Sequence, residues 1–168
     1  MTGGIASGKS EVCRRLRALG LCVYDCDSRC KALYDEVPGL REAVERAIGA
    51  PFSQIGIIFE DAARREALEA VVYPVLKIDL ERWIASQDAP VVFVESAVAA
   101  SKPLFDELWD SIWLVRAPLS SRLERNPKAA SRAGCQQELD PARADLVIDN
   151  DGTLAQLYEK INEKVNTL

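Results

Sequence analysis

The sequence predicts an α/β fold with a doubly wound parallel sheet, and three observations lead to this prediction. Short apolar runs rich in Val, Ile and Trp alternate with stretches of helical periodicity. No internal repeat or low-complexity tract interrupts this alternation. The 168 residues are the length of one domain, and their hydrophobic content of 48% suffices for a buried core. Such alternation is typical of a parallel sheet with helices on its faces.

Each element follows from a local pattern. The expected strands are β-branched or aromatic runs bounded by turn residues, at residues 21–24, 91–94, 111–115 and 146–148. The expected helices are residues 9–19, 28–34, 40–48, 61–72, 75–86, 119–125 and 154–165. In the last helix Leu154, Leu157, Ile161 and Val165 share one face. Because ligands of this fold bind at the carboxyl ends of strands, functional residues are expected just after each strand.

Composition excludes several classes of function. The net charge of -5 lacks the basic character of a nucleic-acid-binding protein. No apolar run has the length of a membrane helix and no leader pattern is visible, so we expect a cytoplasmic protein. Five cysteines without a secretory pattern predict free thiols, and the spacing of Cys22, Cys26 and Cys30 lacks a second pair of zinc ligands. The chain has no His, which excludes hydrolases built on a Ser–His or Cys–His pair.

A glycine-rich loop carries the strongest signal. Residues 3–10 match the phosphate-loop pattern G-x-x-x-x-G-K-[ST], and a helical stretch follows at once. Backbone N–H groups of such a loop surround a phosphate, while Lys9 reaches the β and γ oxygens and the Ser10 hydroxyl binds Mg²⁺. Such a loop ordinarily follows a buried strand, but only Met1 and Thr2 precede it, so we expect further N-terminal residues in the natural protein.

An acidic pair, Asp25 and Asp27, follows the first expected strand. The two-residue period of extended chain would place both carboxylates on one side, where they could orient an acceptor hydroxyl and take its proton. Alternatively, Asp27 only caps the helix that starts at Ser28. The local sequence does not decide between these two interpretations.

Glu95 ends the Val-rich strand, where a phosphate-loop enzyme holds the water shell of Mg²⁺; alternatively it is a solvated carboxylate. Transfer of a phosphoryl group also needs guanidinium donors. Four arginines crowd the stretch after the third expected strand and suggest a lid over about residues 119–143, with Arg132 the candidate catalytic residue: Arg122, Arg125, Arg132 and Arg143.

Three motifs resemble the dephospho-CoA kinase family. The loop at residues 2–10, T-G-G-I-A-S-G-K-S, is similar to that family's T-G-G-I-x-S-G-K-S. Residues 23–27, V-Y-D-C-D, resemble its V-x-D-x-D segment. Residues 144–150, A-D-L-V-I-D-N, resemble its A-D-x-V-I-D-N segment. They occur in the family's order and span nearly the whole chain.

This resemblance implies phosphorylation of the ribose 3′-hydroxyl of dephospho-CoA by ATP with Mg²⁺. It implies a five-stranded parallel sheet of phosphate-loop kinase type, a helical CoA-binding region over about residues 33–86, and a lid. Asp27 would be the base, with Lys9 and Arg132 also catalytic, and Ser10 and Glu95 would hold the metal. The nucleotide-binding residues would be Gly3, Gly4, Ile5, Ala6, Ser7, Gly8, Lys9, Ser10, Glu11, Asp149 and Asn150.

The chain also departs from the family pattern. Tyr73 precedes Pro74 where the family usually has His, Lys31 replaces a common Arg, and Glu11 replaces a usual Thr. The stretches joined at 54–55 and at 126–127 are shorter than in the family, so either the lid is reduced or mobile residues are absent from the sequence.

Two other functions fit the same loop. Another phosphate-loop kinase acting on a nucleoside or metabolite would differ only in its acceptor. A nucleotide-binding regulatory protein would keep the ATP site without turnover. Neither nucleic acid nor membrane is an expected partner, and the oligomeric state is open.

Overall fold

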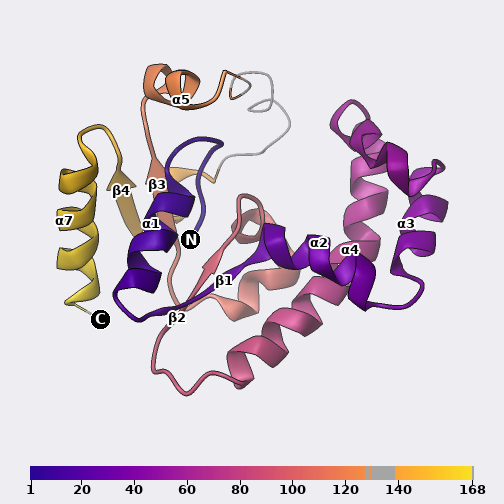
Figure 1. Ribbon diagram of the computed structural model, residues 1–168, viewed down its shortest axis with the longest axis horizontal. Coiled ribbons are helices and arrows are strands. Elements are labelled where there is room, and N and C mark those ends of the chain that lie inside the picture. Colours follow the sequence, from indigo (N-terminus) through magenta and orange to yellow (C-terminus); the bar gives the residue numbers. More distant parts are fainter. Residues whose placement is uncertain (128, 130–138, 168) are drawn as a thin grey trace. The chain divides into compact units, whose positions relative to one another are not determined.

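The structure is a computed structural model that describes residues 1–127, 129 and 139–167 (Figure 1). The chain divides into two compact units. The first comprises Met1–Tyr24 and Gln87–Leu168, and the second comprises Asp25–Ser86.

The first unit contains the strands. β3 (Trp113–Arg116) and β4 (Leu146–Asp149) are parallel, with Trp113 opposite Leu146 and Arg116 opposite Asp149. β1 (Cys22–Asp25), whose last residue opens the second unit, pairs with β2 (Val92–Glu95). These strands match the predicted runs to within two residues, because β-branched and aromatic residues mark them clearly.

Met1 and Thr2 lie between the two strand pairs. The Met1 amino group donates to Val94 O at 2.5 Å, and Ser96 N donates to Met1 O at 3.0 Å. On the other side Thr2 forms a parallel bridge with Leu114, and Val115 N donates to Thr2 O at 2.9 Å. The residues immediately before the loop thus form one bridge. The strands of the described residues form two two-stranded sheets, so the five-stranded sheet that the resemblance implies stays a prediction.

The core of the first unit forms between the strands and two amphipathic helices, α1 (Lys9–Ala18) and α7 (Leu154–Val165). Phe93 and Trp113 meet edge to face with ring centroids 5.1 Å apart, a favourable aromatic geometry. The buried cluster comprises Val12, Leu16, Phe93, Trp113, Val115, Ile148, Leu157 and Ile161. It anchors the start of α1, and with it the glycine-rich loop.

The second unit is helical. It contains α2 (Cys26–Glu36), α3 (Leu40–Ile48), the 3₁₀ segment η1 (Phe52–Phe59) and α4 (Ala62–Ala85). Its buried core is aliphatic, and Tyr34 meets Phe52 edge to face at 4.8 Å. One buried cluster of this unit comprises Val44, Ile48, Leu68 and Val72.

Two helices predicted on either side of Tyr73 form a single helix, which corrects the sequence interpretation. α4 continues through Pro74 although this residue cannot donate to Ala70 O. Buried Leu68, Val72, Leu76 and Leu80 recur every four residues along it, and their packing outweighs the local break.

The remaining elements belong to the first unit. α5 (Leu119–Arg125) matches its prediction, and three short 3₁₀ segments were not predicted: η2 (Ala99–Ser101), η3 (Pro103–Leu108) and η4 (Pro141–Arg143). The stretch proposed as a lid, about 119–143, includes residues outside those that the structure describes. None of the helices in the described part of the chain is long and apolar enough to cross a membrane.

Candidate active site

The glycine-rich loop adopts a left-handed backbone at several positions. Gly3, Ala6 and Gly8 have φ values of 146°, 60° and 107°, and Ser7 N donates to Gly4 O at 3.1 Å. α1 begins at Lys9 directly after Gly8, as predicted. The Lys9 ammonium group turns back over the loop and donates to Gly3 O at 2.7 Å and to Gly4 O at 3.1 Å.

Close backbone contacts explain two of the glycines. A Cβ atom on Gly3 would lie 2.1 Å from Val115 O, and one on Gly8 would lie 2.2 Å from Nδ2 of Asn150. Both separations are far below contact distance, and positive φ adds backbone strain for any other residue. The loop therefore requires glycine at both positions.

Side chains from other elements hold the loop carbonyls outward. Arg122 Nε donates to Ile5 O at 2.8 Å, and Arg125 Nη1 donates to Ala6 O at 3.2 Å. Asn150 Nδ2 donates to Ser7 O at 2.8 Å. With the two bonds from Lys9, every carbonyl from Gly3 to Ser7 accepts a hydrogen bond from a side chain.

The backbone N–H groups of the loop differ from its carbonyls in their hydrogen bonding. In the described structure, the N–H groups of Ile5, Ala6 and Gly8 donate no hydrogen bond to another part of the chain. They lie before the N-terminus of a ten-residue helix, whose dipole favours negative charge. Free amides, a lysine and a helix N-terminus form a site suited to phosphate groups.

Two oxygen ligands meet beside this loop. The Ser10 hydroxyl donates to Oε1 of Glu95 at 3.0 Å, and Glu95 is only 8% exposed at the end of β2. Burial, with the nearby Glu95 charge, raises the pKa of the Cys13 thiol, so this neighbour stays protonated.

These donors fit a hard cation such as Mg²⁺, which prefers oxygen and keeps several waters and phosphate oxygens as ligands. Within the described residues, no group of three or more His, Cys, Asp or Glu side chains forms a metal cluster.

The end of β4 lies against the loop. Arg116 makes a two-pronged contact with Asp149, through Nε at 2.5 Å and Nη2 at 3.1 Å, and this contact lowers the pKa of the Asp149 carboxyl. Lys160 donates to Asp149 O at 2.7 Å. The backbone before Asn150 is thus fixed from both sides.

The unusual Glu11 is neutralised within the first unit. Arg14 donates to both of its carboxylate oxygens, at 3.1 and 2.6 Å, and the Tyr158 hydroxyl donates to one of them. These bonds lower the pKa of Glu11. The negative charge introduced after Ser10 is therefore compensated by α1 and α7.

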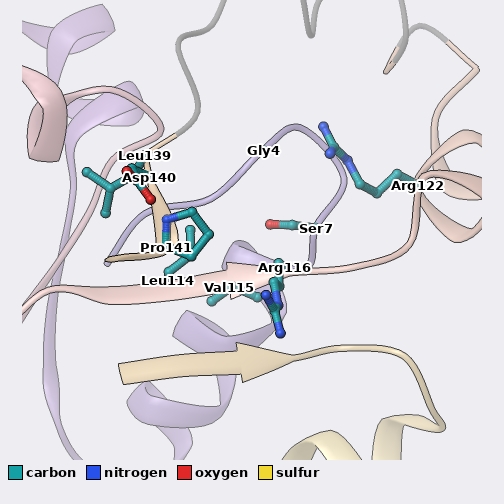
Figure 2. Close-up of a pocket in the computed structure, with 9 residues that line it drawn as sticks. All are labelled: Gly4, Ser7, Leu114, Val115, Arg116, Arg122, Leu139, Asp140 and Pro141. Atoms are coloured by element: carbon teal, nitrogen blue, oxygen red, sulfur yellow. The ribbon is translucent and has the colours of Figure 1, made fainter. Parts of the chain in front are cut away.

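A pocket of about 350 Å³ adjoins the loop (Figure 2). Ser7 is only 1% exposed, and its hydroxyl has no hydrogen-bond partner among the described residues. In this view the hydroxyl points away from Arg122 toward Pro141. The lining residues are Gly4, Ser7, Leu114, Val115, Arg116, Arg122, Leu139, Asp140 and Pro141.

The acidic pair does not have the geometry inferred from the sequence. β1 ends at Asp25, whose carboxylate caps α2 by accepting from Ser28 N at 3.0 Å and from Ser28 Oγ at 2.8 Å. Asp27 is exposed within the first turn of α2. The extended strand therefore ends before Asp27, so the two carboxylates are not aligned as they would be along a strand. The residue that caps α2 is Asp25, not Asp27.

The predicted arginines have different positions. Arg122 and Arg125 bind loop carbonyls, whereas Arg143 is exposed in η4. Arg132 lies outside the described residues. The contacts of Arg122 and Asn150 with the loop were missed, because no local pattern reveals partners separated by more than a hundred residues.

The fold and the site define a phosphate-loop protein of the α/β class. A dephospho-CoA kinase from Porphyromonas gingivalis is 36% identical over 147 residues, which cover 82% of this chain and 71% of that protein. One from Geobacter sulfurreducens is 30% identical over 190 residues, covering 97% of this chain and 94% of that protein. The chain belongs to the dephospho-CoA kinase family. No family model matches the chain.

Two solved structures are similar to this chain in fold. A crystal structure of a Thermus thermophilus protein superposes with a TM-score of 0.77 at 29% identity, covering 99% of this chain and 95% of that one. A dephospho-CoA kinase from Campylobacter jejuni gives a TM-score of 0.64 at 18% identity, with coverages of 98% and 93%, and supports the fold.

The alignment with the Geobacter sulfurreducens protein spans 190 residues and so exceeds the 168 residues of this chain. That relative therefore carries residues within the matched stretch that this chain lacks.

Proposed function

We propose that the protein transfers the γ-phosphoryl group of ATP to the ribose 3′-hydroxyl of dephospho-CoA, giving coenzyme A and ADP. Membership of the dephospho-CoA kinase family supports this reaction. The observation that carries it is the loop itself. Side chains of Arg122, Arg125 and Asn150 bind its carbonyls, while the amides of Ile5, Ala6 and Gly8 donate no hydrogen bond within the described part of the chain.

Each residue has a role in this proposal. Lys9 would leave its loop carbonyls and stabilise the charge of the transferring phosphoryl group, and Ser10 and Glu95 would hold Mg²⁺ through direct and water-mediated contacts. Mg²⁺ would neutralise charge on the phosphates. Asp149 would lie near the adenine, and Arg132 would act from the lid.

The second unit, Asp25–Ser86, would bind the acceptor through its helices, and it carries Asp27. In the reaction the bond between the γ-phosphorus and the bridging oxygen breaks as the acceptor oxygen bonds to the phosphorus. The proton of the acceptor hydroxyl passes to the Asp27 carboxylate, and ADP leaves. We expect this to occur in the cytoplasm.

The test is transfer from ATP and Mg²⁺ to dephospho-CoA, followed by mass spectrometry of the acceptor. Adenosine and pantetheine serve as rival acceptors. The proposal predicts that only dephospho-CoA gains a phosphoryl group. Preferential phosphorylation of a rival acceptor would assign another substrate, and ATP binding without transfer to any acceptor would favour a regulatory role.

A further inference from the structure

We propose that Asn150 is a positioning residue that orients the Ser7–Gly8 peptide so that its amide binds nucleotide phosphate. The inference rests on the proposed nucleotide function. It differs from the expectation that Asn150 acts near the adenine, because it assigns the amide side chain to the loop.

Asn150 is well fixed for such a role. Its backbone N–H donates to Arg116 O at 2.8 Å, which ties it to the end of β3. Its side chain is buried, with the residue only 6% exposed, and Nδ2 donates to Ser7 O at 2.8 Å. One residue therefore links the end of the sheet to the middle of the loop.

The contact between Asn150 and Ser7 O also fixes the direction of the Gly8 N–H, because both groups belong to the same peptide. The Ser7 carbonyl and the Gly8 N–H belong to one planar trans peptide and therefore point in opposite directions. Because Asn150 binds the carbonyl from outside, the Gly8 N–H faces the other way, and it donates no hydrogen bond within the described chain. The Asn150 bond thus aims a free donor at the phosphate site.

The close approach of the two residues supports this pairing. A Cβ atom on Gly8 would lie 2.2 Å from Asn150 Nδ2, so the amide fits only because residue 8 is glycine. Among the described residues, Asn150 is also the one neutral side chain that binds a carbonyl of residues 3–7. Lys9, Arg122 and Arg125 would attract phosphate through charge as well, whereas Asn150 can act only through geometry.

The experiment compares Asn150→Ala with the intact protein by the Kd values for ADP and for adenosine, measured by calorimetry. We expect ADP binding to weaken by about 10-fold, as for one misdirected buried hydrogen bond, while adenosine binding changes less than about twofold. Equal weakening for both ligands would instead place Asn150 on the adenine. An unchanged Kd for ADP, even with a lower Tm, would overturn the proposal and leave a structural role.

Asn150→Asp provides a second test because it keeps the size of the side chain. At about pH 8 its carboxylate has no N–H group to donate to Ser7 O, so the Ser7 carbonyl loses this partner. We expect ADP binding by Asn150→Asp to be at least as weak as by Asn150→Ala. A Kd for ADP equal to that of the intact protein would contradict the proposal.

The matched control is Asn162→Asp on α7. The Asn162 side chain accepts through Oδ1 from Arg15 Nε and Nη2 at 3.0 and 2.9 Å, so a carboxylate preserves its role. We expect its Kd for ADP to match that of the intact protein. If dephospho-CoA is not phosphorylated yet the Asn150 variants still lose ADP binding, the proposed reaction fails while the role of Asn150 stands.

Discussion

The Ser10 hydroxyl donates to Oε1 of Glu95 at 3.0 Å and so connects the first turn of α1 to the end of β2. The two residues are 85 positions apart, and the buried core between α1 and the strands brings them together. A hydroxyl and a carboxylate held at this distance form an oxygen-lined site beside the phosphate loop.

Replacing Glu95 with Gln should weaken the response to Mg²⁺ while keeping the fold. Gln retains an oxygen that accepts from Ser10 but loses the charge that orients metal-bound water. We expect the Mg²⁺ concentration for half-maximal turnover to rise by about 10-fold or more. Binding of ADP without metal is the control and should not change. An unaltered Mg²⁺ requirement would remove Glu95 from the metal site.

Replacing Lys9 with Met removes the cation that folds over Gly3 and Gly4. Because the Lys9 ammonium group would stabilise negative charge in the transition state, we expect its loss to lower kcat by roughly 10²-fold or more. Lys164→Met in the last turn of α7 is the control, since Lys164 is exposed and remote in sequence from every proposed site residue. Equal kinetics for the two variants would contradict the role of Lys9.

The acidic pair should separate into a structural and a catalytic residue. Asp25→Ala removes the cap of α2 and should cost about 1 kcal/mol in the free energy of unfolding, measured with urea. Asp27→Asn keeps the size of the side chain and should reduce turnover by about 10²-fold or more with ADP affinity nearly unchanged. Near-normal turnover of Asp27→Asn would transfer the proposed base to Asp25 or Glu95.

Acid should weaken the contact between Asp149 and Arg116. Arg116 lowers the pKa of Asp149 in the folded protein, so the contact stabilises the fold above the ordinary Asp pKa and is lost as pH falls through the lowered pKa. The Tm of Arg116→Met should therefore lie below that of the intact protein at neutral pH and converge with it in acid. About 1 M salt should reduce the neutral-pH difference, since both side chains are largely exposed. A Tm difference independent of pH would contradict the assignment.

Local patterns predicted the parts of the fold that depend on nearby residues. Runs of apolar residues with Val or Ile identified β2 and β4, and the phosphate-loop pattern located the start of α1 at Lys9. Predictions from local sequence were wrong where tertiary packing or a change from strand to helix determines the structure. The leucines of α4 carry the helix through Pro74, and the turn from β1 into α2 at Asp25 separates two aspartates that an extended chain would align.

The candidate site shows the same division. The sequence predicted Lys9, Ser10 and Glu95 as site residues because each stands at a known position of the phosphate-loop pattern or at a strand end. In the structure the Ser10 hydroxyl contacts Glu95. It could not reveal that Arg122 and Asn150 bind the loop carbonyls, because these bonds depend on the tertiary fold. Nor could it predict that Tyr158 and Arg14 would compensate Glu11.

Hydrogen exchange at the loop amides should show whether a nucleotide is bound. The amides of Ile5, Ala6 and Gly8 have no protein acceptor among the described residues, so their hydrogens should exchange rapidly with heavy water in the free protein. A bound phosphate group should slow that exchange. A peptide covering the loop would then record nucleotide binding by its mass even when no acceptor is phosphorylated, which separates an empty site from an occupied but idle one.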